Sequence, residues 1–399
     1  MKLTIFGIAV LLLALFVSAA NAQVFTVTDL GPLSPTGINT WGQVVGARNG
    51  HAYLWTKAHG MQDLGILPNG TFSQATAIND SGVVTGFADG PGVVVITAPG
   101  SPGTTQCANL IQPFRWKKSA GMQGLGAVSF FNQAYNGGCD FRFYATGINA
   151  FGRIVGYTPD VGTYAWAFTW KKADGITLLD LFNNQTGTDD YQAAGNGINN
   201  IGQVAGQGGP YLSFMTDVSH AVVWNKGVLT DIGSLAGSDP ADLTHCSGAN
   251  GINDRGQVVG WSGTTASSDP CGTLVYSGGI AHAFLWTKSA GMQDLGTLLG
   301  DASSAALKIN FFGQVIGSSG NTITWQRHGE PGGIVRVMGR PFLWSEHEGM
   351  RDLNALIPAN SGWVLNFAAD INIWGQIVGS GTINGQPHGF LLTPSRLLK

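Results

Sequence analysis

Charged residues are scarce in this chain, and their scarcity narrows the possible functions. Lys, Arg, Asp and Glu make up 11% of the 399 residues, less than half of the ~25% found in average soluble domains. The formal net charge of −3 argues against a nucleic-acid partner, because such a partner requires Lys and Arg to neutralise its phosphates. No apolar run reaches the ~20 residues that a transmembrane helix needs, so we expect no membrane span.

Recognisable catalytic and metal-binding motifs are also missing. The sequence has no Gly-x-Ser-x-Gly elbow, His-Glu-x-x-His motif, Walker loop or EF-hand loop, and no Asp-box of the sialidase propellers. We therefore expect neither a cofactor nor a metal. A pair of carboxylates from neighbouring loops stays open as the basis of a hydrolase or lyase.

Glycine, by contrast, is abundant. The chain has 60 glycines, about twice the usual share of ~7%, and they lack the three-residue period of collagen. Aromatic residues at 10% exclude simple disorder, because they supply surface for a packed core.

The first 22 residues have the pattern of a signal peptide. Lys2 is positive, residues 3–17 are apolar, and Ala20-Asn21-Ala22 fits a small-x-small cleavage site. We expect residues 1–22 to be removed and residues 23–399 to form one domain. The mature protein is then secreted or periplasmic, and we expect it to be a monomer.

A ten-residue motif occurs seven times in the chain. Its copies are GINTWGQVVG, AINDSGVVTG, GINAFGRIVG, GINNIGQVAG, GINDRGQVVG, KINFFGQVIG and DINIWGQIVG. Each is followed by a second motif of the HAFLWT type, and six of these by a third of the GMQDLG type. The repeated structural residues are an Asn and the Gly three positions later: Asn39, Gly42, Asn79, Gly82, Asn149, Gly152, Asn199, Gly202, Asn253, Gly256, Asn310, Gly313, Asn372 and Gly375.

Each repeat predicts four short antiparallel strands. Asn followed by Gly three residues later suits a type I turn that ends in a left-handed residue, a common three-residue hairpin loop. In HAFLWT, Phe284 and Trp286 point to one side and Ala283 and Leu285 to the other, so both faces of the sheet are apolar. Four-stranded sheets buried on both faces and repeated radially describe a β-propeller.

The repeat count predicts how the ring closes. The seventh repeat stops after its third strand, and the mature N-terminus begins with VFTVTDLG, residues 24–31, which matches the missing fourth strand. The predicted fold is therefore an all-β, seven-bladed propeller of four-stranded antiparallel blades, with its N-terminal strand completing blade 7.

These motifs resemble those of the HAF family of bacterial extracellular repeats, named for His-Ala-Phe. The resemblance covers residues 24–395 and implies an exported repeat protein, but it supplies no catalytic residue or ligand. The chain departs from the motif at Gln112, Trp166 and Arg340, where His is expected. At the other copies, His51, His220, His282 and His388 start a third strand, and we interpret them as local structural hydrogen-bond partners rather than metal ligands.

Long, variable segments fall between strands two and three and between blades, which places them on one face of a propeller. We name this side the loop face, and such loops commonly carry binding residues. Tyr135, Tyr191, Tyr211 and Tyr276 lie in these segments and are candidates to stack on sugar rings, or simply to pack the loops.

The central tunnel provides a second candidate site. The residue before the motif isoleucine is small in five blades but is Lys308 in blade 6 and Asp370 in blade 7. We expect these two to form an ion pair beside the tunnel, either as mutual compensation or as a polar anchor for a ligand.

The four cysteines, in an exported protein, predict disulfides. The blade assignment favours Cys107–Cys139 and Cys246–Cys271 among the three possible pairings. Taken together, the sequence favours a non-catalytic binding module that holds a carbohydrate or an extracellular protein on the loop face. An enzyme acting on an extracellular polysaccharide and a structural envelope or matrix component are the alternatives.

Overall fold

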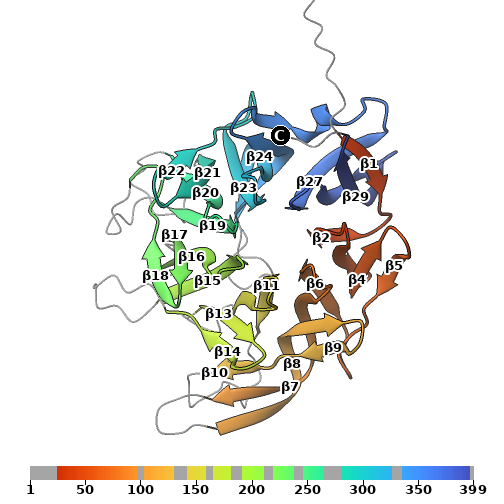
Figure 1. Cartoon of the computed structure of the whole chain (residues 1–399), viewed down its shortest axis with the longest axis vertical. Helices are drawn as coiled ribbons and strands as arrows, with labels where there is room; N and C mark the ends of the chain where they lie inside the picture. Colours follow the sequence, from red (N-terminus) through yellow and green to blue (C-terminus); the bar gives the residue numbers. More distant parts are fainter. Residues whose placement is uncertain are drawn as a thin grey trace, which may run out of the picture.

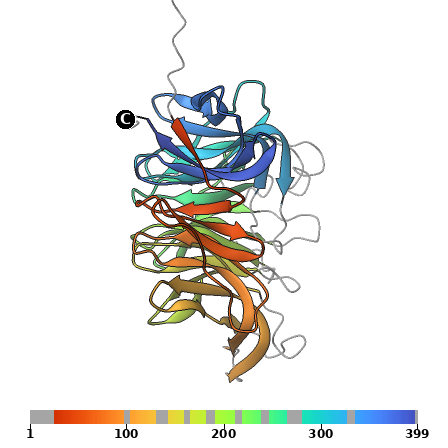
Figure 2. The same ribbon diagram turned by 90° about the vertical axis from the view of Figure 1, so that its right-hand side faces the viewer.

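Seven sheets, each with four antiparallel strands and one with an added fifth strand, surround a central axis (Figure 1), and in side view they form a thick disc (Figure 2). The computed structural model describes residues 25–96, 103–129, 142–158, 165–180, 191–210, 219–237, 246–264, 280–325 and 335–395. The fold is thus the predicted seven-bladed β-propeller. The expected signal peptide lies outside these residues, and the described ranges contain no helix with the length and hydrophobicity to cross a bilayer.

In every blade the first strand lies nearest the axis and the fourth at the rim. The first four blades consist of β2 (Ser34–Ile38), β3 (Val44–Arg48), β4 (His51–Thr56) and β5 (Gly60–Asp63); β6 (Ser73–Ile78), β7 (Val84–Ile96), β8 (Gly103–Lys117) and β9 (Gly121–Gly124); β11 (Tyr144–Ile148), β12 (Ile154–Thr158), β13 (Trp166–Lys171) and β14 (Gly175–Leu178); and β15 (Tyr191–Ile198), β16 (Val204–Pro210), β17 (His220–Asn225) and β18 (Val228–Asp231). Blade 2 also carries β10 (Ala127–Ser129), which pairs in parallel with β7. The repeat motif did not predict this fifth strand.

The remaining blades complete the circle. They consist of β19 (Ser247–Ile252), β20 (Val258–Gly263), β21 (Ala281–Thr287) and β22 (Gly291–Asp294); β23 (Ser303–Ile309), β24 (Val315–Trp325), β25 (Val335–Ser345) and β26 (Gly349–Asp352); and β27 (Trp363–Ile371), β28 (Ile377–Ile383), β29 (Gln386–Pro394) and β1 (Phe25–Asp29). A short 3-10 helix, η2 (Leu353–Leu356), follows blade 6.

The N-terminal strand closes the ring, as the repeat count predicts. β1 pairs antiparallel with β29 from Phe25 opposite Pro394 to Asp29 opposite Phe390. The Phe25 side chain is fully buried and packs in the core between blades 6 and 7. The first and last described strands therefore share one sheet, which removes two free strand edges.

The predicted hairpin explains the motif glycines. Gly42 has a φ of +72°, and its N–H donates to Asn39 O while Asn39 N–H donates to Gln43 O. Only glycine adopts this left-handed conformation without strain, and the equivalent glycine of each of the other six motifs also has positive φ.

The final glycine of the motif is required by close strand contact. A β-bulge interrupts each inner strand, in blade 1 between Pro35 and Gly37. A Cβ added at Gly46 would lie 2.2 Å from Ser34 O, and one at Gly379 would lie 1.9 Å from Phe367 O. These distances are shorter than any van der Waals contact, so no other residue fits.

The hydrophobic core lies between neighbouring blades rather than within one. One cluster joins Val45 of blade 1 to Phe114 and Trp116 of blade 2, and another joins Val155 of blade 3 to Trp224 of blade 4. Because each sheet is covered on both faces, the surfaces left for ligands are the two ends of the disc and the rim formed by the fourth strands.

Candidate functional site

The seven motif asparagines form a closed ring around the tunnel. Each amide donates to the backbone carbonyl of the motif asparagine in the next blade, with N···O distances between 2.9 and 3.2 Å. The last of these bonds runs from Asn372 of blade 7 to Asn39 of blade 1. The ring fixes the position of each hairpin turn relative to the next.

Each asparagine also organises its own turn. In blade 5, Asn253 Oδ1 accepts from the N–H groups of Arg255 and Gln257, while its Nδ2 also donates to Gln257 Oε1. The asparagines are buried, and this arrangement satisfies their polar atoms. The predicted structural role of the motif Asn and Gly is therefore observed, and the Asn adds an interblade bond that the local pattern does not reveal.

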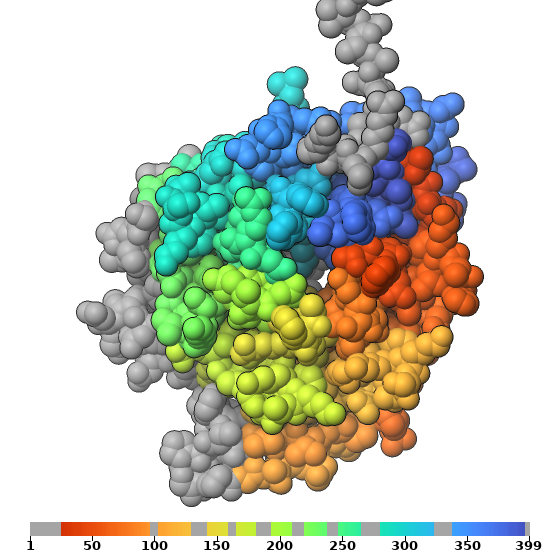
Figure 3. Space-filling model, in the orientation of Figure 1, coloured from red at the N-terminus to blue at the C-terminus, as the bar shows by residue number. Residues whose placement is uncertain are grey.

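We name the side that carries these hairpins the turn face, defined by residues 39–42, 79–82, 149–152, 199–202, 253–256, 310–313 and 372–375. It surrounds a central depression of about 220 Å³ that the seven turns line. Figure 3 shows this side of the molecule with an opening at its centre.

Large, solvent-exposed apolar side chains from the turns of five blades lie around this depression. They occupy the two variable positions between the motif Asn and Gly, and their exposed fractions are 75% for Trp41, 83% for Phe151, 69% for Ile201, 44% for Phe311, 63% for Phe312 and 53% for Trp374. We name these six residues the apolar ring. Because these side chains are mostly exposed, packing in the core does not explain why they are apolar. Clusters of exposed apolar groups commonly mark interaction sites.

The two tryptophans of the ring are held by hydrogen bonds. Trp41 Nε1 donates to Asp80 O of the next blade at 2.9 Å, and Trp374 Nε1 donates to Thr40 O at 3.0 Å. Each indole therefore bridges to the neighbouring turn, and its polar N–H is already used. What remains for a ligand is the apolar surface of the ring system, which is suited to stacking.

Two grooves run outward from the turn face between blades. The larger, about 790 Å³, lies between blades 1 and 2 and contains Lys117, Lys118 and His59 together with Asp80. The smaller, about 400 Å³, spans blades 2 to 4. Its lining includes Phe151 and Ile201, four cationic residues and no acidic residue: Arg115, Arg153, Lys171 and Lys172.

Acidic side chains on the turn face are used in structure. Asp80 Oδ1 accepts from Thr40 N–H, and the Asp254 carboxylate accepts from both the backbone and the side-chain amide of Asn200. These contacts link successive turns, so neither carboxylate is organised as one half of an acid–base pair.

The motif histidines have the structural role that we expect. Their Nδ1 atoms lie 2.7–3.0 Å from the Asp of the neighbouring fourth strand, in the pairs His51–Asp63, His220–Asp231, His282–Asp294 and His388–Asp29. In blade 7 the Asp comes from β1, so this pair spans the ring closure. The hydrogen bond with Asp294 raises the pKa of His282.

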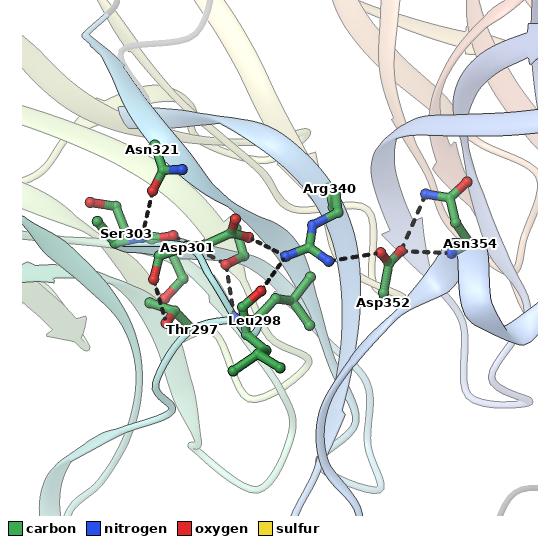
Figure 4. A network of polar contacts seen from close by, with 12 residues as sticks. Thr297, Leu298, Asp301, Ser303, Asn321, Arg340, Asp352 and Asn354 are labelled. Atoms are coloured by element: carbon green, nitrogen blue, oxygen red, sulfur yellow. Dashed lines mark hydrogen bonds and ion pairs between the residues drawn. The ribbon is translucent and has the colours of Figure 1, made fainter.

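Blades that lack the histidine form other contacts at the same place. In blade 2, Gln112 donates to Pro91 O and accepts from Gly126 N–H. In blade 6, Arg340 contacts Asp352 of its own fourth strand at 3.3 Å, and also Asp301 at 2.9 Å and Leu299 O at 3.0 Å on the connection from blade 5 (Figure 4). Arg340, which stands at the motif histidine position in blade 6, therefore still links strands three and four.

The predicted tunnel ion pair does not form. Asp370 accepts from the N–H groups of Ile38 and Ile371, both at 2.9 Å, and no ion pair joins it to Lys308, although both residues lie in the described part of the chain. Burial raises the pKa of the Asp370 carboxyl, while the charge of Lys308 acts in the opposite direction. Backbone donors hold the carboxylate in place of the lysine; a role for Lys308 and Asp370 as a ligand anchor stays a prediction.

Most of the predicted loop-face residues lie outside the described residues. This is true of Tyr135, Tyr211 and Tyr276, and Tyr191 is described only as the first backbone position of β15. Cys139 and Cys271 are outside as well. Cys107 and Cys246 are buried, and neither is a free thiol; their pairing stays a prediction.

Two loop-face acids that the structure does describe serve the fold. Asp89 accepts from Thr71 N–H, Thr71 Oγ1 and Phe72 N–H. Burial alone would raise the pKa of the Asp89 carboxyl, but these hydrogen bonds outweigh it and lower the pKa. Asp301 is engaged by Arg340, so neither acid is available to form the catalytic pair that the sequence left open.

The comparisons with known proteins assign no family to the chain. No protein-family model matches the chain, and no curated protein does. Among solved structures, virginiamycin B lyase from Staphylococcus aureus is similar over 92% of this chain and 99% of its own, at 8% identity and a TM-score of 0.45. The β-propeller domain of the Trilobed protease from Pyrococcus furiosus is similar over 85% of this chain and 99% of its own, at 9% identity and a TM-score of 0.33.

Proposed function

We propose that this protein is an exported, non-catalytic binding module that holds a carbohydrate or an extracellular protein against its turn face. The apolar ring is the observation that carries the proposal. Six large apolar side chains from the turns of five blades lie around one depression, five of them at the same turn position, and all six are exposed to a degree that core packing does not require.

The way the turns are held supports binding on a rigid surface. The asparagine ring and the tryptophan hydrogen bonds fix neighbouring turns to one another before any ligand arrives. A ligand that contacts several blades therefore meets a preformed surface and does not have to order it, which reduces the entropic cost of binding.

The use of the nearby carboxylates favours binding over catalysis. Asp80 and Asp254 are the acidic residues that line the depression, and both accept backbone N–H groups across blade boundaries. A general acid or base needs a carboxyl that faces the substrate, whereas each of these two is engaged by hydrogen bonds from the neighbouring turn.

A binding panel tests the proposal. The chain is assayed against immobilised neutral polysaccharides, acidic polysaccharides and extracellular protein extracts, next to a Trp41→Ser/Phe312→Ser double variant. Leu299→Ser is the matched control, because Leu299 is 98% exposed but lies on the connection between blades 5 and 6, on the loop face. We expect the double variant to lose binding and the control to retain it.

Retained binding by a correctly folded double variant, or loss of binding by Leu299→Ser alone, contradicts the proposal. Because Trp41 also bridges two turns, Phe312→Ser is tested by itself as well. This side chain contacts Phe311 in an edge-to-face pair, and its loss should weaken binding without unfolding the protein.

A further inference from the structure

We infer that the smaller groove of the turn face, across blades 2 to 4, binds a negatively charged polysaccharide. We name it the cationic groove and define it by Arg115, Arg153, Lys171, Lys172, Phe151 and Ile201. The inference deepens the proposed function and rests on it, because the groove opens from the apolar ring through Phe151 and Ile201.

The charge of this groove is local. The whole chain has a net charge of −3, yet the groove lining contains four cations and no acid. One of the four is balanced, since Lys171 pairs with Asp174 at the turn between β13 and β14. The other three cationic side chains have no ion pair among the described residues, so the groove presents an uncompensated positive field to an incoming anion.

The seven blades of this chain provide an internal reference for these residues. The position of Arg153 is Gln in five other blades: Gln43, Gln203, Gln257, Gln314 and Gln376. In those blades the Gln oxygen accepts a hydrogen bond from the motif Asn amide. Blade 3 has lost that structural bond and has a guanidinium instead, which points to a different role.

Arg153 is held in place but not fully satisfied. Its Nη2 donates to Thr169 Oγ1 at 3.2 Å, while its buried Nε has no hydrogen-bond partner among the described residues. A buried guanidinium nitrogen without a partner is costly. The residue as a whole is only half-buried and lines the groove, so an anion there is a suitable acceptor for the accessible part of the guanidinium, which matches the geometry of carboxylate and phosphate groups.

Arg115 departs from the repeat in the same way. Its register position on the third strand is occupied by apolar residues in five blades: Leu54, Val223, Leu285, Leu343 and Leu391. Two of the four cations therefore replace residues that serve packing or turn structure elsewhere, and both of them line the same groove.

The concave shape of the cationic groove favours a polymer chain over a membrane surface as its ligand. A bilayer surface contacts protruding groups, whereas Arg115 and Arg153 are half-buried and lie inside a groove. A chain of sugars fits a groove that spans three blades, with carboxylates toward the cations and ring faces toward Phe151, which is 83% exposed.

The test uses an Arg115→Leu/Arg153→Gln variant. These substitutions restore the residues found at the same positions in other blades, so the fold should be retained. Arg153→Gln also gives the Asn149 amide the side-chain acceptor that the motif Asn has in those blades. The probe is polygalacturonate, with dextran as the neutral polymer and phosphatidylglycerol vesicles as the membrane arm.

We expect wild type to bind polygalacturonate in a salt-sensitive manner, and the variant to bind at least about tenfold more weakly, because a charge-assisted hydrogen bond commonly contributes that much. Equal affinity of both proteins, or binding to vesicles but not to polygalacturonate, would overturn the inference. If dextran or a protein binds through the apolar ring while polygalacturonate does not, this inference fails and the proposed function stands. If no ligand of the panel binds, both fail.

Discussion

The asparagine ring makes a quantitative prediction about stability at a single buried side chain. We consider Asn253, which is 5% exposed. It accepts from Arg255 N–H at 3.0 Å and Gln257 N–H at 3.1 Å, and donates to Gln257 Oε1 at 2.8 Å and Asn310 O at 2.9 Å. Asn253→Ala removes all four bonds and leaves their partners in place.

The expected cost follows from these four bonds. Each neutral hydrogen bond contributes about 1 kcal/mol net, and a buried group left without its partner costs about 1–3 kcal/mol. Since the turn borders the central depression, water can reach part of the exposed backbone and reduce the penalty. We therefore expect Asn253→Ala to lower the free energy of unfolding by roughly 2–4 kcal/mol.

Asn253→Asp separates the two roles of the side chain. The carboxylate still accepts the two N–H groups of its own turn, but it cannot donate to Asn310 O in blade 6. We expect this variant to keep its turn and lose the interblade bond, and to recover stability at low pH, where a protonated carboxyl donates again.

Urea denaturation at several pH values measures both variants, with Arg255→Ala as the control because Arg255 is exposed in the same turn. A cost below about 1 kcal/mol for Asn253→Ala, or an equal cost for Arg255→Ala, would show that the ring does not stabilise the propeller.

Three further predictions concern the ring closure, the histidine pairs and the cysteines. Deletion of residues 24–31 should cost at least about 3–5 kcal/mol, the usual cost of losing one large core side chain such as Phe25, and an unchanged melting temperature would refute closure by β1. The hydrogen bond with Asp294 raises the pKa of His282; burial alone would raise the pKa of Asp294, but its hydrogen bond with His282 lowers it. The charged pair therefore stabilises the fold fully at pH values between the ordinary pKa of Asp, about 4, and the ordinary pKa of His, about 6.5. That contribution is lost as the pH rises through the raised pKa of His282, so the difference in melting temperature between wild type and His282→Gln should shrink between about pH 6 and 8, and a constant difference would refute the charged pair. Non-reducing peptide mapping should find Cys107–Cys139 and Cys246–Cys271, each contributing about 3 kcal/mol, and a Cys139–Cys246 linkage would refute the assignment.

The fold could be predicted from the sequence because the motif residues act locally. Asn39 and Gly42 specify a hairpin through their own conformations, and seven copies of that hairpin leave few other architectures. The match of residues 24–31 to a fourth strand was sufficient to predict closure. The parallel strand β10 was missed, because it pairs with a part of β7 that lies beyond the repeat motif.

The candidate site was harder to predict, because the exposure of the apolar-ring side chains depends on how the seven hairpin turns are arranged around the axis. Trp41, Phe151 and Trp374 stand between the motif Asn and Gly, where the sequence pattern reads them as variable turn residues. Four of the seven repeats have an aromatic residue between the motif Asn and Gly, and this could have indicated a binding site, since a solvent-exposed turn ordinarily has polar residues. The tunnel pair was wrong for a related reason: Asp370 finds backbone N–H donors, which a residue-by-residue pattern cannot show.

Hydrogen exchange of the chain with and without polygalacturonate tests the central claim most directly, because it reports which end of the disc meets the ligand. The account predicts slower exchange at the turn-face hairpins 149–153 and 199–203, with the connection 298–302 on the opposite end unchanged. Protection confined to the connections of the loop face, with the hairpins unaffected by bound polymer, would contradict it.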